Sequence, residues 1–227
     1  TVGAFHERDF SGDWERLALG AYYNLVMPYV LGSGLFAHDD PRNTHILDYF
    51  SEHGSLMLGL LRFDKHVFPT EGNGTDDLYG MRFNTALIRH GRIRQALLAF
   101  YSKLAHGLTR DTFIGCEVAE VQPRPGWARR PMCRPPNSAS NACFLQTLRH
   151  LLLLENDRDD DGVGDELRIF PAVPRAWLCD GAKLSFADLP SSFGPVSAHV
   201  ESRLADGCVL LSLRLPEKTK WRKTFAG

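Results

Sequence analysis

Apolar residues recur with the period of an amphipathic helix through the first part of the chain. The first such stripe begins at Trp14, with Asp13 in the N-cap position, and Pro28 kinks or ends it. The same period predicts four further helices, over residues 44–62, 77–90, 93–104 and 138–154. Because the connections between consecutive helices are short, neighbouring helices are expected to run antiparallel. Residues 1–155 are therefore predicted to form a domain of helical hairpins.

The pattern changes to short strands in the last part of the chain. ELRIFP and KLSF are strand candidates, and Asp206-Gly207 joins two longer apolar runs at a position typical of a tight hairpin turn. In the last run the apolar residues alternate with Ser212 and Arg214, which is typical of a sheet with one solvated face. Residues 156–227 are predicted to hold an acidic loop and a small antiparallel β domain. The chain as a whole is predicted to be mainly α.

Composition and charge narrow the classes of partner. The 227 residues include 26 Lys and Arg against 27 Asp and Glu, so the formal charge is −1. A chain with this balance is predicted to lack the basic surface that binds nucleic acid or an anionic membrane. No apolar run approaches the roughly 18 residues that a membrane span needs. Five cysteines without a C-x-x-C pair argue against a zinc site and a full disulfide framework, and are interpreted as mostly buried free thiols.

An acidic segment, NDRDDDGVGDEL, separates the two regions. Its spacing, D-x-D-x-D-G-x-x-D, lets alternating carboxylates around a glycine turn converge on one calcium ion. The loop departs from an EF-hand, because Arg168 stands where the bidentate glutamate should be, and it is closer to the loops of thrombospondin type-3 repeats. We expect structural calcium and no organic cofactor, with a solvated acidic turn as the alternative. The candidate ligands are Asp157, Asp159, Asp161 and Asp165, with the carbonyl of Val163.

Four segments in a fixed order resemble a known family. They are TRDTFIGCE, PPNSASNACFLQTLRHLL, LRIFPAVPRAWL and LPSSFGPVSAHVESRL, and together they resemble the C-terminal part of six-hairpin glycosidases, the α/α-toroid enzymes. The sequence looks most like the α-L-rhamnosidase-type families. The positions that match the family motifs are Thr112 with Glu117, Ser140 with Asn141, Pro171 to Pro174, and Phe193 to Ser197.

The resemblance implies an incomplete α/α toroid. Cys116 and Val118 stand where the family usually has aromatic residues, and five predicted helices are fewer than a complete toroid needs. The upstream hairpins, where the family usually keeps the partner acid, are absent from the sequence. The resemblance therefore implies a C-terminal portion, a fragment or a degenerate relative, with further domains of a longer chain as partners. It also favours a secreted or periplasmic location.

The family chemistry depends on two carboxyl groups. The residue in the place of Glu117 is linked in the family to water activation in an inverting glycoside hydrolysis, which needs a second carboxyl group across the scissile bond. Asp76 and Asp77 are the local candidates for that group, although Asp76 or Thr75 could instead cap a helix and Glu117 could be an ordinary loop charge. We expect Glu117 at the mouth of a pocket formed by residues 109–116 and by the loop around Asp76 to Tyr79.

Further residues are candidates for holding a carbohydrate. Arg110 and Asp111 could bind sugar hydroxyls or pair with neighbouring side chains, and Trp127 could stack on a sugar ring or cover the core. The substrate-binding candidates are Tyr79, Arg110, Asp111, Trp127, Asn137 and Asn141. The leading hypothesis is a glycoside hydrolase. The alternatives are a non-catalytic carbohydrate-binding or scaffold protein, and a polysaccharide lyase or phosphorylase.

Overall fold

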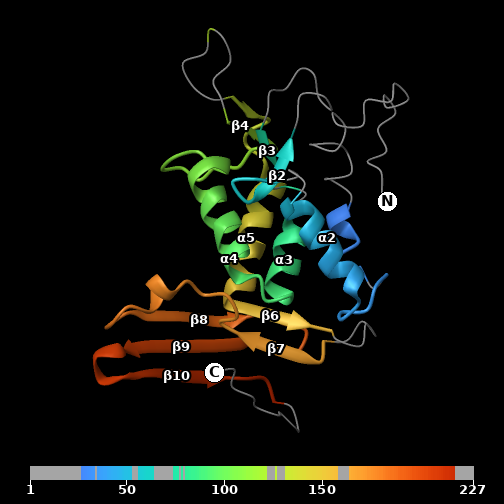
Figure 1. The fold of residues 1–227 in the computed structure, drawn as a ribbon. Coiled ribbons are helices and arrows are strands. Elements are labelled where there is room, and N and C mark those ends of the chain that lie inside the picture. The colour runs from blue at the N-terminus through green and yellow to red at the C-terminus, as the bar shows by residue number, and fades with distance from the viewer. Residues whose placement is uncertain are drawn as a thin grey trace.

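The computed structural model describes residues 27–33, 35–52, 56–63, 74–76, 78, 80–121, 126, 131–157 and 164–217. Within these residues the α-helices are α2 (Pro41–Glu52), α3 (Met81–Arg89), α4 (Ile93–Ser102) and α5 (Ser138–Leu152). A π-helical turn, η4 (Lys103–Gly107), continues α4, and three 3-10 turns occur at η3 (Met27–Tyr29), η5 (Arg175–Leu178) and η6 (Leu204–Asp206). The helices form the middle layer of the molecule (Figure 1).

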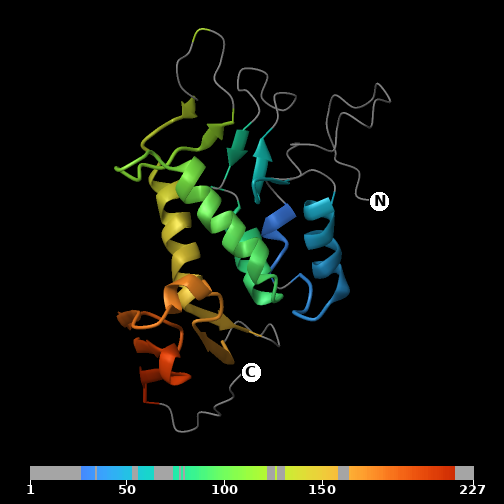
Figure 2. The same ribbon diagram turned by 60° about the vertical axis from the view of Figure 1, so that its left-hand side comes forward.

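Three antiparallel sheets lie at the two ends of this helical layer (Figures 1 and 2). One end carries a five-stranded sheet, in the order β1 (Leu56–Met57), β2 (Leu60–Phe63), β3 (Gly74–Asp76), β4 (Val118–Glu120) and β5 (Met132–Cys133). The opposite end carries a pair, β6 (Leu153–Asn156) with β7 (Glu166–Ile169), and a three-stranded sheet in which β9 (Val196–Arg203) lies between β8 (Lys183–Leu189) and β10 (Cys208–Arg214).

The predicted fold class is wrong. The described residues combine four short α-helices with three antiparallel sheets, and they do not form the mainly α arrangement of helical hairpins that an incomplete α/α toroid requires. The second predicted helix, over residues 44–62, is replaced after Glu52 by the β1–β2 hairpin. The turn of this hairpin contains Leu58 and Gly59, both with positive φ, a conformation that ends helical periodicity.

Pairing between segments far apart in the sequence forms the rest of the sheet that replaces the predicted helices. β2 pairs with β3, and β3 pairs with β4, although β4 lies more than 40 residues further along the chain. The third predicted helix, over 77–90, begins only at Met81, after β3. The first predicted helix, from Trp14, lies outside the described residues. The division into domains at residue 155 stays a prediction.

Two local predictions are confirmed. Helix α5 begins at Ser138, with Asn137 as its N-cap, and the Asn137 side chain accepts a hydrogen bond of 2.8 Å from the Ser140 N–H. The β9–β10 hairpin turns at Gly207, whose φ of 70° suits glycine. The expected alternation of burial in the last strand is wrong, because all seven residues of β10 are exposed at the edge of its sheet. The cysteines are free thiols, and two of the five are exposed.

The core joins the helices to the C-terminal sheets. Phe50 of α2 and Phe83 of α3 are almost fully buried, and their ring centroids lie 5.3 Å apart. Trp177, from the 3-10 turn η5, and Phe100 of α4 form a T-shaped pair with ring centroids 6.1 Å apart. The fully or largely buried cluster includes Leu47, Leu61, Leu87, Ile88, Ala96, Leu151, Leu154 and Ala172. This shared core anchors the C-terminal region to the helices.

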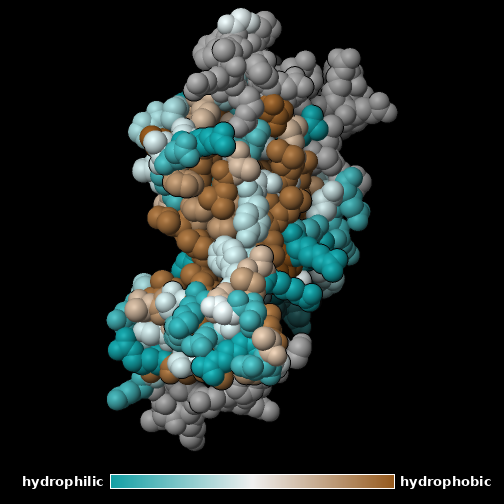
Figure 3. All heavy atoms as spheres, turned by 90° about the vertical axis from the view of Figure 1, so that its left-hand side faces the viewer, coloured by the Kyte–Doolittle hydropathy of each residue, from teal (hydrophilic) through white to brown (hydrophobic). Residues whose placement is uncertain are grey.

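The outer face of α4 and α5 keeps apolar side chains at the surface. Leu98 and Tyr101 of α4 and Leu145 of α5 are exposed. Apolar residues gather on this side of the helical layer, above the more polar C-terminal sheets (Figure 3). No helix within the described ranges is long and apolar enough to cross a bilayer.

Burial makes His150 a source of pH-dependent stability. The residue is 7% exposed at the end of α5, and its Nδ1 lies 2.9 Å from the hydroxyl of Thr85. Burial is the main cause that lowers the pKa of His150 from 6.5 to about 4, and the nearby guanidiniums of Arg149 and Arg89 add to it. The folded protein therefore resists a proton that the unfolded chain accepts below about pH 6.5.

Because of His150, we expect the free energy of unfolding to fall by about 2 kcal/mol when the pH is lowered from 7 to 5. The stability that the neutral His150 imidazole contributes is fully present above the pKa of the unfolded chain. It is lost as the pH falls toward the lower pKa of the folded protein. Urea unfolding of the wild type and of His150→Gln at both pH values measures it, because other groups cancel in the difference. The matched control is His199→Gln, on an exposed position of β9. Equal pH dependence in the wild type and both variants contradicts the prediction.

Candidate functional site

The loop between α4 and β4 is closed on itself by hydrogen bonds. After η4, Leu108 and Gly115 form an isolated antiparallel bridge, so residues 109–114 protrude from the end of the helical layer. The hydroxyl of Thr109 accepts a hydrogen bond of 2.8 Å from the Ile114 N–H and lies 2.5 Å from the hydroxyl of Thr112. The protruding segment, which we call the 109–114 loop, therefore has a defined shape.

The N-terminus of α5 holds this loop in place. Asn141 accepts a hydrogen bond of 2.6 Å from the Gly115 N–H, and its amide donates to the carbonyl of Phe113. The backbone N–H of Asn137 donates to the Gly115 carbonyl. A side chain at position 115 would collide with the Asn141 amide oxygen, which explains the glycine. Both asparagines thus position the loop, and their binding of a substrate stays a prediction.

Three residues around this junction hold a left-handed backbone conformation without being glycine. They are Asp111, Phe113 and Arg134, with φ of 67°, 53° and 51°. Such a conformation costs about 1–3 kcal/mol per residue and persists where surrounding contacts impose it, which is frequent at functional sites. Arg110, Asp111 and Phe113 are all exposed on the 109–114 loop, and Phe113 is 57% exposed. Arg110 and Asp111 are candidates from the sequence, whereas no sequence pattern indicates the exposed ring of Phe113.

Glu117 follows the loop and precedes β4. Its carboxylate forms an ion pair of 2.8 Å with the guanidinium of Arg134, and 22% of its side chain is exposed. Its backbone N–H donates to the carbonyl of Cys133 in β5. Glu117 is therefore a carboxylate paired with a guanidinium at a partly open position.

The β3–β4 ladder brings the second candidate segment to the same place. Asp76 is registered against Val118, the residue that follows Glu117. The two segments therefore meet side by side, through strand pairing rather than through returning helical loops. The side chain of Asp76 lies outside the part of the structure described, as do Asp77, Tyr79 and Trp127. Their roles, and the position of Glu117 at the mouth of a pocket, stay predictions.

A buried lysine lies in the π-helical turn η4, shortly before the 109–114 loop. Lys103, in the π-helical turn η4, is 2% exposed and donates a hydrogen bond of 2.5 Å to the hydroxyl of Ser140, which is fully buried. Its aliphatic stem packs over Gly107, where a side chain would collide with it. π-helical turns are frequent at functional sites. Sequence patterns missed Lys103, because its position in a helical stripe resembles an ordinary surface lysine.

Ser140→Ala should lower the free energy of unfolding by about 1.5–3 kcal/mol, the usual contribution of a hydrogen bond to a charged group. The substitution removes a hydroxyl that a buried ammonium group contacts, while alanine keeps the helix propensity of α5. Ser138→Ala, at an exposed position two residues earlier in the same helix, is the matched control and should change stability by less than about 0.5 kcal/mol. Chemical denaturation measures both. Similar small losses in the two variants would show that the Lys103 contact contributes little.

The described residues on either side of the acidic loop, Asn156 with Asp157 and Gly164 with Asp165, lie at the opposite end of the molecule. The two ends of the loop meet in the β6–β7 hairpin, where the Asp165 N–H donates to the carbonyl of Asn156. Asp157 and Asp165 belong to the described residues, whereas Asp159, Asp161 and Val163 lie outside them. Within the described residues, no group of three or more His, Cys, Asp or Glu side chains is arranged to hold a metal ion. The calcium site therefore stays a prediction.

Calcium binding by this loop should raise the melting temperature, because a ligand that binds the folded state stabilises it by mass action. Thermal unfolding in chelator and in millimolar CaCl₂ measures the shift. Asp165→Asn should reduce the shift, and Asp188→Asn, at an exposed position of β8, should leave it unchanged. An identical melting temperature with and without calcium would rule out the site.

The described candidate residues thus divide between two regions. Asp76, Arg110, Asp111, Glu117, Asn137 and Asn141 belong to segments at the end of the helices that carries the five-stranded sheet. Asp157 and Asp165 belong to the other end (Figure 1). The residues that sequence reasoning missed at the first end are Lys103, Phe113 and Arg134. Arg134 is distinguished in the sequence only by the two prolines that follow it.

Comparison of the chain with protein-family models, with curated proteins and with solved structures finds no match.

Proposed function

We propose that this protein hydrolyses glycosidic bonds and that Glu117 activates the attacking water. The observation that supports this most directly is the β3–β4 register, which brings the backbone of Asp76 beside the segment of Glu117. Glycoside hydrolysis needs two carboxyl groups on opposite sides of the scissile bond, and a separation of roughly 6.5–9.5 Å leaves room for the water of an inverting reaction. The order of the four sequence motifs supports the same chemistry.

The surroundings of Glu117 fit a site for a sugar. The 109–114 loop presents the polar side chains of Arg110 and Asp111 together with the exposed ring of Phe113. Polar groups of this kind bind hydroxyls, and an aromatic ring can cover the apolar face of a pyranose. In this proposal the asparagines of α5 act on the substrate indirectly, because they hold the loop that contacts it.

The experiment is an activity assay with a defined stereochemical outcome. The chain, or the longer polypeptide if its gene encodes one, is incubated with nitrophenyl glycosides of both anomeric series and with oligosaccharides. Proton NMR in the first minutes identifies the anomer of the released sugar. Hydrolysis with inversion supports the proposal, since it requires a water-activating carboxylate. Retention would oppose the role given to Glu117, and failure to hydrolyse any substrate would oppose the activity.

One observation favours a second candidate, a non-catalytic carbohydrate-binding protein. One carboxylate oxygen of Glu117 already accepts a hydrogen bond of 2.8 Å from the guanidinium of Arg134, so that oxygen is not available to a substrate water. A protein that uses this surface only for binding would retain oligosaccharides without turnover. Equilibrium binding of the same oligosaccharides, measured beside the activity assay, separates the two functions: saturable binding without hydrolysis identifies the second.

A further inference from the structure

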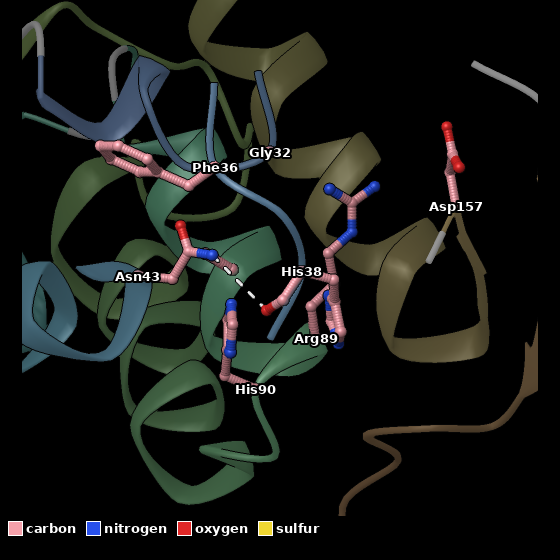
Figure 4. A pocket seen from close by; sticks show the side chains of 8 residues that line it. Gly32, Phe36, His38, Asn43, Arg89, His90 and Asp157 are labelled. Carbon is pink, nitrogen blue, oxygen red and sulfur yellow. Dashed lines mark hydrogen bonds between the residues drawn. The ribbon is translucent and has the colours of Figure 1, made fainter. Parts of the chain in front are cut away.

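The cavity between the segment before α2 and the end of α3 has room for water only. Its volume is about 30 Å³, which holds about two water molecules. The stacked rings of His38 and His90 form part of its wall, and the amide of Asn43 donates to the carbonyl of Ala37 (Figure 4). A larger partner must therefore bind elsewhere on the surface.

The outer edge of strand β10 is open. β10 ends the three-stranded sheet, and β9 pairs with it on one side. No described strand pairs with its other side, where backbone N–H and C=O groups alternate. The strand lies on the side of the sheet away from the helices (Figure 1), and all seven of its residues are exposed. Such an edge is a template for a further strand.

The sequence of β10 lacks the features that normally prevent edge pairing. Soluble proteins protect edge strands with lysine, with proline or with a bulge. From Cys208 to Leu213 the strand has no charged residue and no proline, and its register with β9 is regular over all seven residues. Arg214, at the end of the strand, is paired with Asp188 of β8. This edge is therefore suited to pairing with another strand.

One face of β10 carries a row of exposed apolar side chains. Val209, Leu211 and Leu213 are 44%, 43% and 40% exposed. Their register partners in β9 are buried, so the row continues the core-facing side of the sheet beyond the limit of the core. A second apolar strand beside β10 would cover part of this row.

The apolar pattern of β10 is symmetric about Leu211. When a second β10 runs antiparallel with Leu211 opposite Leu211, Val209 of each copy lies opposite Leu213 of the other, and all seven residues are paired. Residues opposite each other share a face, so the two apolar rows join. A centre one residue later would place Cys208 opposite Pro216, which has no N–H to donate. A centre one residue earlier would place Leu213 opposite the turn.

The charges at the two ends of β10 match the same arrangement. Asp206, in the turn before the strand, has no ion-pair partner among the described residues, and Arg214 ends the strand. Antiparallel pairing places Arg214 opposite Cys208 of the other copy, and so beside its Asp206. Arg203, on the neighbouring strand, is already paired with Glu201 and adds little repulsion.

We propose that β10 pairs antiparallel with β10 of a second copy of this chain, about a two-fold axis at Leu211, and joins two three-stranded sheets into one. Such a contact uses the same surface on both copies and closes on itself, so the assembly stops at a dimer. One strand from each copy supplies most of the contact, which is smaller than the roughly 800 Å² per partner of a standard interface, and a micromolar dissociation constant is expected. The contact lies away from the 109–114 loop and is independent of the proposed hydrolysis (Figure 1).

Sedimentation velocity from the low to the high micromolar range measures the association. A reversible change from monomer to dimer is expected as the concentration rises. Leu211→Lys places two ammonium groups opposite each other at the two-fold axis and should weaken the dimer at least about tenfold, because like charges directly opposite each other repel. The matched control is Leu145→Lys, the same substitution at an exposed leucine of α5, which should leave the association unchanged. Circular dichroism establishes that both variants are folded.

A disulfide tests the register. In a background with the two exposed cysteines, Cys179 and Cys208, changed to serine, Leu211→Cys should form a covalent dimer on oxidation. At the axis the two Cβ atoms lie about 4.5–5.5 Å apart, within reach of a disulfide. Val209→Cys should not form one, because its two copies are separated by about 13 Å along the strands. Non-reducing gel electrophoresis measures both.

Three results overturn the proposal. The chain stays monomeric at every concentration, which means that the edge of β10 serves another polypeptide or none. Leu145→Lys dissociates the dimer as strongly as Leu211→Lys, which means that the helical face is the interface. Val209→Cys and Leu211→Cys form covalent dimers equally, or neither does, which excludes the axis at Leu211. None of these results bears on whether the protein hydrolyses glycosides.

Discussion

Replacing Glu117 by glutamine should lower kcat for glycoside hydrolysis by at least about a hundredfold, the lower end of the effect of removing a general base. Glutamine has nearly the shape of glutamate and keeps an oxygen that can accept from Arg134, so the loop and the β4–β5 region should stay in place. It cannot take a proton from water. The loss should therefore fall on kcat, with little change in KM, because binding of the ground state does not depend on proton transfer.

The matched control for this prediction is Asp188→Asn. Asp188 of β8 is also a carboxylate in an ion pair with an arginine, Arg214, but it lies on the C-terminal sheet, and more than half of each side chain is exposed. This variant should hydrolyse substrate at the wild-type rate. Steady-state kinetics on the best substrate from the activity assay measures both variants. If Glu117→Gln loses less than about a hundredfold, Glu117 holds Arg134 in place and takes no part in the chemistry.

Phe50→Ala should lower the free energy of unfolding by about 3–5 kcal/mol, the range observed for removal of a large buried aromatic side chain. Phe50 is fully buried in α2 and lies between the rings of Phe83 and Tyr49, with centroids 5.3 and 6.2 Å away. The substitution removes this packing and leaves a cavity that the surrounding helices fill only in part. Because a domain has about 5–15 kcal/mol of stability in total, a large part of it should be lost.

Urea unfolding followed by circular dichroism measures this loss. Phe113→Ala is the same substitution at a ring that is 57% exposed, and it should change the free energy of unfolding by less than about 0.5 kcal/mol. A cost below about 1 kcal/mol for Phe50→Ala would mean that α2 contributes little to the core. In that event the packing of α2 against α3 would have to be reconsidered.

The candidate site illustrates which contacts a sequence pattern can predict. Glu117 was selected by its motif, and the segment of Asp76 was expected near it, which the β3–β4 register bears out for the backbone. The two segments meet because β3 pairs with β4, which a helical pattern does not predict. Arg134 and Lys103 were missed because their roles depend on partners 17 and 37 residues away. No local spacing rule relates residues at such separations.

The fold, like the site, depends on contacts between distant segments that no local pattern predicts. Residues 56–63 are apolar enough to continue a helix, yet they form the β1–β2 hairpin because β1 and β2 pair with each other and β3 pairs with the other edge of β2. A helix satisfies its backbone within one segment, whereas a strand needs another segment beside it. Propensity alone therefore favoured the helix. Pairing with a strand from further along the chain overrides this local preference and makes the segment a hairpin.

The sequence by itself determined the local features of this protein: the start of α5 at its Asn137 cap, the turn at Gly207, and the near-balance of charge. Each depends on residues within a few positions of one another or on composition. Tertiary structure alone decided the sheet that joins the segments of Asp76 and Glu117, the burial of Lys103 against Ser140, and the stacking of the His38 and His90 rings, whose centroids lie 5.1 Å apart. These depend on distant segments meeting in one geometry, because burial and strand pairing are properties of the packed chain.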